Sequence, residues 1–541
     1  MSHLLCLVLM FLGVNVAARA VPMIAKREVL PDLSRGFCRN WKFGANIAND
    51  VLYMNGLDGG IVPGDNNGSN NYLVELNLSA PIDLGDGANY KLSTIPSNVP
   101  KLKDQALWAN AANTTLFSYG GRGANGTSSD DGVWTYNIAD NSWRIQQTSV
   151  KPVRLVSGAY VNAPEIQASY WIGGLQDSDT TPSITDKTRT YATGMIQFNT
   201  TTQEFTLLDA PFTPVQEGAL VYLPVKKLGA LIFFGGEVPS AQSGINVELT
   251  PNAWNYVQVY DIEEGVWYNQ TTTGNVTPRT QFCASVVTDA DPSYSINPQY
   301  HIYVISGADF ETREIVTGVS YLSIPSFKWY QARGLSTGRM SHVCQTYGRQ
   351  IFGIGGRQAW ADNSSAGCYN MPAFIYDAQS EVVRNEFDPA LSTYSVPSAT
   401  ANDIQASPYP SEWANNTLRF LFPGTSGSTY QRPTRTSRGG ADKGAIAGGV
   451  VGGVAGAAII ASLIWWFLRC RRRKAQELDG TQLESEPKSQ VLEELPAEQV
   501  YKELHSHPRN ELQGDTALIH ELDSSPSDGQ VEGQEVVQKN K

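Results

Sequence analysis

The stretch that decides the fold is residues 257–267, VQVYDIEEGVW. Valines alternate with other residues up to Tyr260, the turn-forming group IEEG follows, and Trp267 stands seven positions after Tyr260. This arrangement predicts two neighbouring antiparallel strands that are joined by a tight turn.

The same pattern recurs at 133–143 (VWTYNIADNSW), 195–205 (MIQFNTTTQEF), 319–329 (VSYLSIPSFKW) and 373–383 (AFIYDAQSEVV). The pairs that keep the offset of seven are Tyr136 and Trp143, Phe198 and Phe205, Leu322 and Trp329, and Tyr376 and Val383. A weaker first copy, LVELNLSAPI, keeps the strand but has no Trp. The constant offset indicates that one structural unit is repeated.

An apolar strand that ends in glycine precedes each copy: DVLYMNG (50–56), TLFSYGG (115–121), SYWIGG (169–174), LIFFGG (231–236), HIYVISG (301–307) and QIFGIGG (350–356). A phosphate-binding loop would need a helix directly after the glycines. GGEVPSAQSG and GGLQDSDTTP instead continue with proline and turn residues. We therefore expect the glycines to let strand ends bend and pack closely.

A glycine pair, a strand with Tyr-Asp or a similar pair, and then Trp together resemble the kelch motif. From Cys38 to Phe387 the chain resembles kelch-repeat β-propellers, including the galactose oxidase type. The resemblance implies an all-β fold of four-stranded blades around an axis. It gives a structural role to the motif residues Gly120, Gly121, Trp143, Gly173, Gly174, Gly235, Gly236, Trp267, Trp329, Gly355 and Gly356.

Six glycine motifs favour six blades, and the strand-like TLRFLF within 388–421 leaves a degenerate seventh open. Ring closure is expected through pairing of the N-terminal strand near WKFGANI with the last blade, since an open ring would expose a sheet edge.

The two ends of the chain predict a single-pass type I membrane protein. Residues 1–20 resemble a secretory signal peptide that ends in Ala18-Arg19-Ala20. Residues 444–468 are uncharged and long enough to cross a bilayer, and the basic run that follows marks the cytoplasmic side. The expected order is a signal peptide (1–20), an N-terminal segment (21–37), the propeller (38–421), a flexible stalk (422–443), a transmembrane helix (444–468) and a disordered acidic tail (469–541).

Glycosylation sequons support this topology, because all of them precede the membrane segment: Asn67, Asn77, Asn113, Asn125, Asn199, Asn269, Asn275, Asn363 and Asn415. The plasma membrane or another secretory-pathway membrane is the expected location. A ladder of Gly444, Gly448, Gly452 and Gly456 suggests homodimers through the membrane helix. A net charge of −12 makes a nucleic-acid partner unexpected.

Four cysteines remain outside the membrane, in an oxidising compartment where disulfides persist. Cys344 and Cys368 bracket one hairpin and are the favoured pair, which leaves Cys38 with Cys283. Cys470, beside the bilayer, is either palmitoylated or a free thiol.

The sequence predicts no catalytic, cofactor or metal site. The mature outer part holds only two histidines, His301 and His342, and they match no copper-oxidase motif. A Gly-x-Ser-x-Gly elbow is absent from the sequence. Arg154, Arg279 and Arg339 recur just ahead of a repeat, where a structural role that bridges blades is favoured over an arginine triad of the sialidase type.

The segments after the glycine motifs differ greatly between repeats, and in a propeller they emerge on one face. Trp254, Trp360 and Tyr369 lie in them and are candidates to bind a ligand, or else to pack under their own loops. The whole architecture resembles that of fungal single-pass kelch-repeat membrane proteins. The resemblance implies a cell-surface glycoprotein that recognises a cell-wall glycan or a protein in adhesion or sensing. The alternatives are a carbohydrate-active hydrolase or oxidase, and a scaffold that acts through its tail.

Overall fold

The computed structural model describes residues 40–57, 71–123, 132–289, 298–358, 360 and 372–422. No helix within these ranges is long and apolar enough to span a bilayer. The predicted signal peptide, nearly all of the stalk, the membrane helix with its glycine ladder, and the cytoplasmic tail lie outside the described residues.

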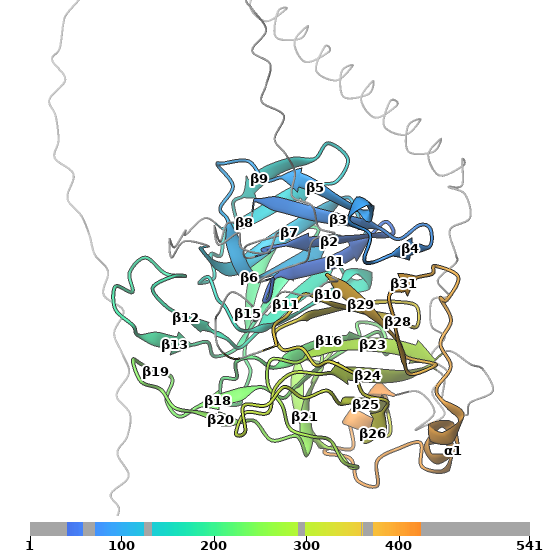
Figure 1. Cartoon of the computed structure of the whole chain (residues 1–541). Helices are drawn as coiled ribbons and strands as arrows, with labels where there is room; N and C mark the ends of the chain where they lie inside the picture. Colours follow the sequence, from blue (N-terminus) through green and yellow to red (C-terminus); the bar gives the residue numbers. More distant parts are fainter. Residues whose placement is uncertain are drawn as a thin grey trace, which may run out of the picture. The chain divides into compact units, whose positions relative to one another are not determined.

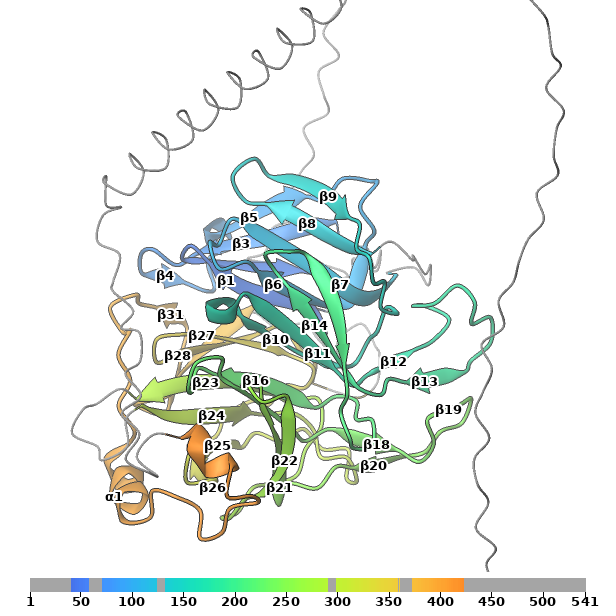
Figure 2. The ribbon, with the colours of Figure 1, turned by 180° about the vertical axis from the view of Figure 1, so that it is seen from behind.

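Six antiparallel four-stranded sheets follow one another along the chain, and we number these blades 1 to 6 (Figures 1 and 2). Blade 1 consists of β1 (Gly44–Ala48), β2 (Val51–Asn55), β3 (Tyr72–Asn77) and β5 (Tyr90–Thr94), and blade 2 of β6 (Leu102–Ala109), β7 (Thr115–Gly123), β8 (Val133–Asn137) and β9 (Ser142–Gln146). Blade 3 consists of β10 (Ala159–Ala163), β11 (Ala168–Ile172), β14 (Met195–Asn199) and β15 (Glu204–Leu208), and blade 4 of β16 (Ala219–Leu223), β17 (Ala230–Phe234), β21 (Tyr256–Asp261) and β22 (Val266–Thr271). Blade 5 consists of β23 (Cys283–Asp289), β24 (Gln299–Ile305), β25 (Val319–Ile324) and β26 (Lys328–Ala332), and blade 6 of β27 (Val343–Tyr347), β28 (Gln350–Ile354), β29 (Ala373–Asp377) and β30 (Val382–Arg384).

The offset of seven is a cross-strand register between the third and fourth strands of a blade. Tyr260 lies directly opposite Trp267, and the other four pairs face each other in the same way: Tyr136 and Trp143, Phe198 and Phe205, Leu322 and Trp329, and Tyr376 and Val383. The predicted strand pair is therefore confirmed in all five copies. Directly opposed aromatic and apolar side chains are the stabilising unit of such a pair.

The first strands of the blades contact one another in circular order, from β1 through β6, β10, β16, β23 and β27 back to β1. Apolar side chains of neighbouring blades pack into clusters at each of the six junctions, including the junction between blades 6 and 1. Burial of apolar surface stabilises a fold by about 25 cal/mol per Å², so the burial between blades holds the whole ring together.

The ring closes in a different way from the expected pairing of the N-terminal strand with the last blade. β1 pairs with β2 in its own blade, so blade 1 is complete by itself. The junction is instead held by hydrogen bonds from the amides of Lys42 and Gly356 to the carbonyls of Ser341 and Asn40, at 3.1 and 2.7 Å. A short ladder joins β31 (Glu386–Phe387) to β4 (Ile82–Asp83) on the outside.

The segment considered as a seventh blade is not a sheet. It forms the helix α1 (Ser398–Ala406), and the strand-like TLRFLF is mostly the 3₁₀ helix η4 (Leu418–Leu421). Ile404 of α1 packs against blades 5 and 6, and Leu418 and Leu421 pack against blades 4 and 5. TLRFLF is apolar because it covers the ring, rather than because it pairs as a strand.

The favoured cysteine pairing is wrong, because the structure joins Cys283 to Cys344. These residues lie on β23 and β27, so the disulfide connects the inner strands of blades 5 and 6. Spacing along the chain favoured a bridge within one hairpin, whereas the ring brings residues 61 positions apart side by side. Cys38 and Cys368 lie outside the described residues.

The glycine pairs have the structural role that was predicted for them. Gly174 has a φ of +80°, and a Cβ atom there would lie 2.2 Å from the carbonyl oxygen of Val156. Gly236, with a φ of +84°, would clash in the same way at 2.3 Å from the carbonyl oxygen of Gln216. Only glycine allows this combination of left-handed backbone and close approach.

A candidate ligand-binding cavity

Long loops of blades 3 and 4 join above one face of the ring. β12 (Leu175–Gln176) and β13 (Arg189–Tyr191) from blade 3 form a small sheet with β19 (Ser243–Gly244) from blade 4. Beside it, β18 (Glu237–Pro239) pairs with β20 (Leu249–Pro251), as Figure 1 shows. The loop insertions of blades 3 and 4 thus pair with each other, and together they form a wall above this face of the ring.

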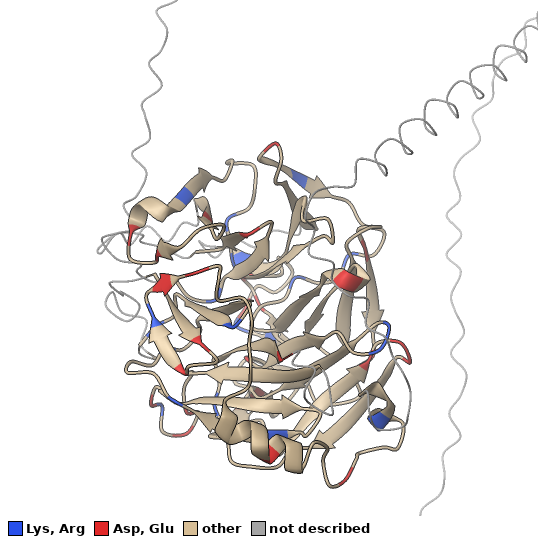
Figure 3. Cartoon of the chain, turned by 90° about the vertical axis from the view of Figure 1, so that its right-hand side faces the viewer, with Lys and Arg blue, Asp and Glu red and all other residues tan. Residues whose placement is uncertain are grey.

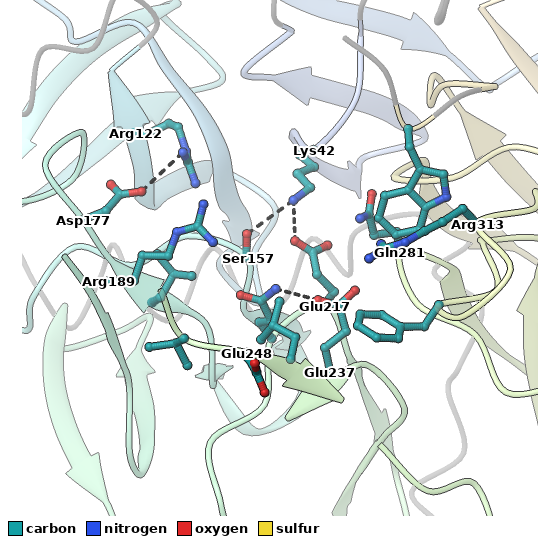
Figure 4. A pocket seen from close by; sticks show the side chains of 16 residues that line it. Lys42, Arg122, Ser157, Asp177, Arg189, Glu217, Glu237, Glu248, Gln281 and Arg313 are labelled. Carbon is teal, nitrogen blue, oxygen red and sulfur yellow. Dashed lines mark hydrogen bonds and ion pairs between the residues drawn. The ribbon is translucent and has the colours of Figure 1, made fainter. Parts of the chain in front are cut away.

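A cavity of about 640 Å³ lies within this wall (Figure 4). Its lining comes from the loops of blades 2 to 6 and from the residues just before the inner strands: Lys42, Arg122, Ser157, Leu175, Asp177, Arg189, Gln216, Glu217, Glu237, Val247, Glu248, Leu249, Gln281, Phe310, Arg313 and Trp360. Cavities of this size bind small molecules in many proteins.

The floor of the cavity includes Lys42, Ser157, Glu217 and Gln281, which belong to a set of six residues with one member from each blade. We call these six the axial residues. Five of them lie two positions before the first residue of the inner strand, and Asp104 lies within β6 at a position that the register with β7 skips. All six have a left-handed backbone, with φ between 52° and 61°: Lys42, Asp104, Ser157, Glu217, Gln281 and Ser341. Non-glycine residues rarely adopt this conformation, and it clusters at functional sites. Here it occurs six times around one axis.

Lys42 spans the axis. Its ammonium group forms an ion pair with Glu217 of blade 4, which is the blade opposite in a ring of six, and donates to Ser157 Oγ at 3.3 Å. The remaining axial residues pair on either side of this bridge. The Ser157 amide donates to Asp104 Oδ2 at 3.1 Å, and the Ser341 hydroxyl donates to Gln281. Side-chain contacts thus connect Lys42, Glu217, Ser157 and Asp104, and Gln281 and Ser341 form a separate pair.

Arg122 on β7 extends this network toward the wall. Its guanidinium lies 3.4 Å from Asp177, 3.7 Å from Asp179 and 3.9 Å from Asp104. Burial raises the pKa of the Asp104 carboxyl, while Lys42 and Arg122 act in the opposite direction. The cations around Asp104 therefore compensate in part for the loss of water.

Glu237 is the most enclosed acid that lines the cavity, with 3% of its surface exposed. Its carboxyl accepts from Gln216 Nε2 at 2.6 Å and from Thr280 Oγ1 at 2.8 Å. Burial, and then the charge of Glu217, raise its pKa above the usual value. Glu237 thus favours its neutral form more strongly than an ordinary glutamate does.

The aromatic part of the cavity holds an arginine. The Arg313 guanidinium carbon lies 4.4 Å from the ring centroid of Trp360 and 4.8 Å from that of Phe310. These contacts orient a cation without neutralising it. Arg189, on the supporting sheet, points into the cavity from the opposite wall (Figure 4).

The three ligand candidates from the sequence separate in the structure. Trp360 lines the cavity. Trp254 does not, because it is 6% exposed and packs against Phe234, Phe282 and Trp329 between blades 4 and 5. Its interpretation as a binding residue is therefore corrected to a core residue. Tyr369 lies outside the described residues.

Both histidines lie away from the cavity and are buried. Burial lowers the pKa of His301 to about 3, and burial together with Arg339 lowers that of His342 to about 3. His342 Nε2 lies 2.9 Å from Cys283 Sγ, and these two residues and Cys344 have ligand atoms within 4.8 Å of one another. Since the two sulfur atoms are bonded to each other, the cluster lacks the thiolates that bind metal.

The recurring arginines donate to backbone carbonyls. Arg154 reaches the carbonyl of Gly120 in the preceding blade at 2.9 Å, Arg339 that of Gly355 at 2.9 Å, and Arg279 that of Gly318 at 2.8 Å. All three are buried and none lines the cavity. Their structural role is that of clamps on the glycine turns and the neighbouring loops.

Of the sequon asparagines, Asn77, Asn269, Asn275 and Asn415 are exposed, and Asn113 and Asn199 are half-buried. None of these six lines the cavity. Asn67, Asn125 and Asn363 lie outside the described residues. Glycosylation remains a prediction. On the side of the propeller shown in Figure 3, acidic and basic residues are interspersed.

Comparison with known proteins gives one relative in sequence. The chain is 26% identical over 426 residues, 67% of its length, to a protein of Arthroderma benhamiae described as a kelch repeat-containing protein. The chain spans 59% of that relative's length. No family model matches the chain. Among solved structures, YjhT is 14% identical, with a TM-score of 0.44 over 64% of this chain and 97% of YjhT. The sequence relative, together with six four-stranded blades and the register of their outer strands, confirms the resemblance to kelch-repeat β-propellers.

Proposed function

We propose that this chain is a membrane-anchored cell-surface glycoprotein whose propeller binds an extracellular ligand in the axial cavity, in adhesion or sensing. One observation carries the proposal. Loops that differ from repeat to repeat converge on a single cavity, whose floor is polar and whose wall holds Trp360 and Phe310. Variable loops on a rigid scaffold are a common way to build a recognition site.

The membrane anchor and the outer location of the propeller are supported by the predicted signal peptide, membrane segment and one-sided sequons. They are tested by expressing the full chain and treating intact cells with a glycosidase and with an antibody to the propeller. A mobility shift after the glycosidase and antibody labelling without permeabilisation are expected. Labelling only after permeabilisation would place the propeller elsewhere.

Ligand binding is tested by screening the full-length protein against a panel of glycans and of cell-surface proteins. Trp360→Ala should weaken the binding that is found, since truncation of a central aromatic typically costs 2 kcal/mol or more. Leu207→Ala is the control, because Leu207 is 62% exposed on the outer strand β15. Equal binding by the two variants would contradict recognition in the cavity.

A second candidate, a carbohydrate-active hydrolase, is supported by two glutamates in the cavity. Glu237 has a raised pKa, which suits a general acid, and Glu217 is paired with Lys42. Product release from an oligosaccharide panel, abolished by Glu237→Gln while binding persists, would establish the hydrolase. Binding without turnover by the unmodified protein would leave recognition alone.

A further inference from the structure

The charges that line the cavity are neutralised unequally. At the floor, Lys42 is paired with Glu217, and at one wall Arg122 lies among Asp104, Asp177 and Asp179. Among the described residues, no carboxylate lies within ion-pairing distance of Arg189 or Arg313. The described part of the cavity thus contains two cations that have no acidic partner there.

Neutral contacts position the Arg313 guanidinium, whereas a small sheet fixes only the backbone of Arg189, whose side chain is exposed. Arg313 lies against the rings of Phe310 and Trp360. Arg189 belongs to β13, which is paired with β12 on one side and with β19 on the other. A cation that is positioned in advance loses less freedom when it binds an anion. Arginine is also the side chain that matches a carboxylate with two parallel hydrogen bonds.

Of the acids that line the cavity, Asp177 lies beside Arg122 and Glu217 is paired with Lys42, which leaves Glu237 and Glu248. Burial, and then the charge of Glu217, raise the pKa of Glu237, so it favours its neutral form more strongly than an ordinary glutamate does. Glu248 is exposed on the loop of blade 4. The floor below offers hydroxyl, amide and carboxyl groups of Ser157, Gln281 and Glu237, which suit a ligand rich in hydroxyl groups.

We infer that the cavity takes an acidic saccharide, whose hydroxyl groups meet the polar floor and whose carboxylate meets Arg189 or Arg313. This inference rests on the proposed function and names the ligand class of the same cavity. The aromatic wall provides an apolar surface for a sugar ring, and about 640 Å³ accommodates a short oligosaccharide.

The test compares trigalacturonic acid with its methyl ester, which has the same rings but no charge, in calorimetric titrations of the full-length protein. We expect the acid to bind at least tenfold more tightly, as charge-assisted hydrogen bonds predict, and to lose this advantage as salt is added. Arg189→Gln and Arg313→Gln should each reduce the ratio of the two affinities. Arg144→Gln, an exposed arginine on β9, should leave the ratio unchanged.

Several results would overturn the inference. Equal affinity for acid and ester, or an unchanged ratio in the double variant Arg189→Gln plus Arg313→Gln, would show that the rim arginines do not select a carboxylate. Inorganic phosphate that competes as well as the saccharide would indicate a general anion site. Absence of binding by both saccharides would also refute the acidic-saccharide class.

The same experiment separates this inference from the proposed function. If the ester binds as well as the acid and Trp360→Ala weakens both, the cavity is a recognition site for a different class of ligand. If Trp360→Ala does not change the binding of any ligand in the wider panel, the proposed function itself fails.

Discussion

Two parts of each blade differ in how much they vary from one repeat to the next. The glycine turn and the outer strand pair are nearly the same in every repeat, and they bury their side chains between neighbouring blades. The segment after the glycine turn differs in each repeat, and in blades 3 and 4 it forms small sheets of its own. The repeated part supplies most of the packing between blades, and the variable part, together with the axial residues, supplies the chemistry of the cavity. Substitutions in the two parts should therefore have different consequences.

Two tryptophans of the variable loops should show the largest contrast. Trp254→Ala is expected to lower the free energy of unfolding by about 3–5 kcal/mol, because a buried tryptophan leaves a large void. Trp360→Ala should lower it by about 1 kcal/mol or less and act on ligand binding instead. Chemical denaturation followed by circular dichroism measures both. Equal losses would show that the loop of blade 6 is as structural as that of blade 4.

Two glycines provide the next contrast. Gly174→Ala should cost about 2–4 kcal/mol, since a side chain at its positive φ is strained and its Cβ would strike the backbone of Val156. Gly244→Ala on β19 should cost less than about 1 kcal/mol, because its φ is not positive and the nearest atom belongs to the flexible Val247 side chain. The comparison would lose its basis if Gly244→Ala proved the more harmful.

The buried histidines should make the repeated part sensitive to acid. The pKa of His301 is about 3 in the folded protein and near 6.5 when unfolded, so between these values only the unfolded chain takes up the proton. Stability should therefore fall as the pH drops from 6.5 toward 3, by about 1.4 kcal/mol per pH unit for each such histidine.

Substitution of one histidine tests this acid sensitivity. His301→Phe keeps a ring against Tyr321 and Tyr394 and should remove one histidine's share of the slope. Unfolding free energies measured from pH 7 to pH 4 check it. If the unfolding free energy of His301→Phe depends on pH as steeply as that of the parent protein, other groups cause the acid sensitivity.

The cavity should show a smaller dependence of the opposite sign. Because the folded pKa of Glu237 is raised above 4.5, the unfolded chain ionises first as the pH rises, and stability falls above that value. Glu237→Gln should remove this loss, so its stability relative to the parent protein should increase with pH. Paired melting experiments at acidic and neutral pH measure the difference. A difference that is constant with pH would mean that Glu237 ionises normally.

The sequence predicts the repeated part of the molecule well and the cavity poorly. Tyr260 and Trp267 could be placed opposite each other because cross-strand register is local, and the same offset recurs in five blades. The disulfide could not be predicted, because Cys283 and Cys344 meet only when two blades pack side by side. Trp254 was ambiguous for the same reason, since only packing between blades 4 and 5 shows that it is buried.

The axial residues were missed altogether. Lysine, aspartate, serine, glutamate and glutamine occupy the six positions, so no residue type marks them in the sequence. They share a backbone conformation, and all but Asp104 lie two residues ahead of an inner strand; both features become apparent only once the strands are known. Arg122 and Glu237 were missed as well, although each directly follows a glycine pair, because the residue type at that place differs between repeats.

The bridge from Lys42 to Glu217 has a consequence for the shape of what can bind. A side chain that crosses the centre of the ring obstructs passage along the axis beneath the cavity. A long polymer cannot be threaded through such a site, so only a chain terminus or a side branch can reach the floor. The number of binding sites on a polymer would therefore depend on its number of ends rather than on its number of repeating units. Cutting a polymer into short pieces would increase the number of sites that this cavity can bind.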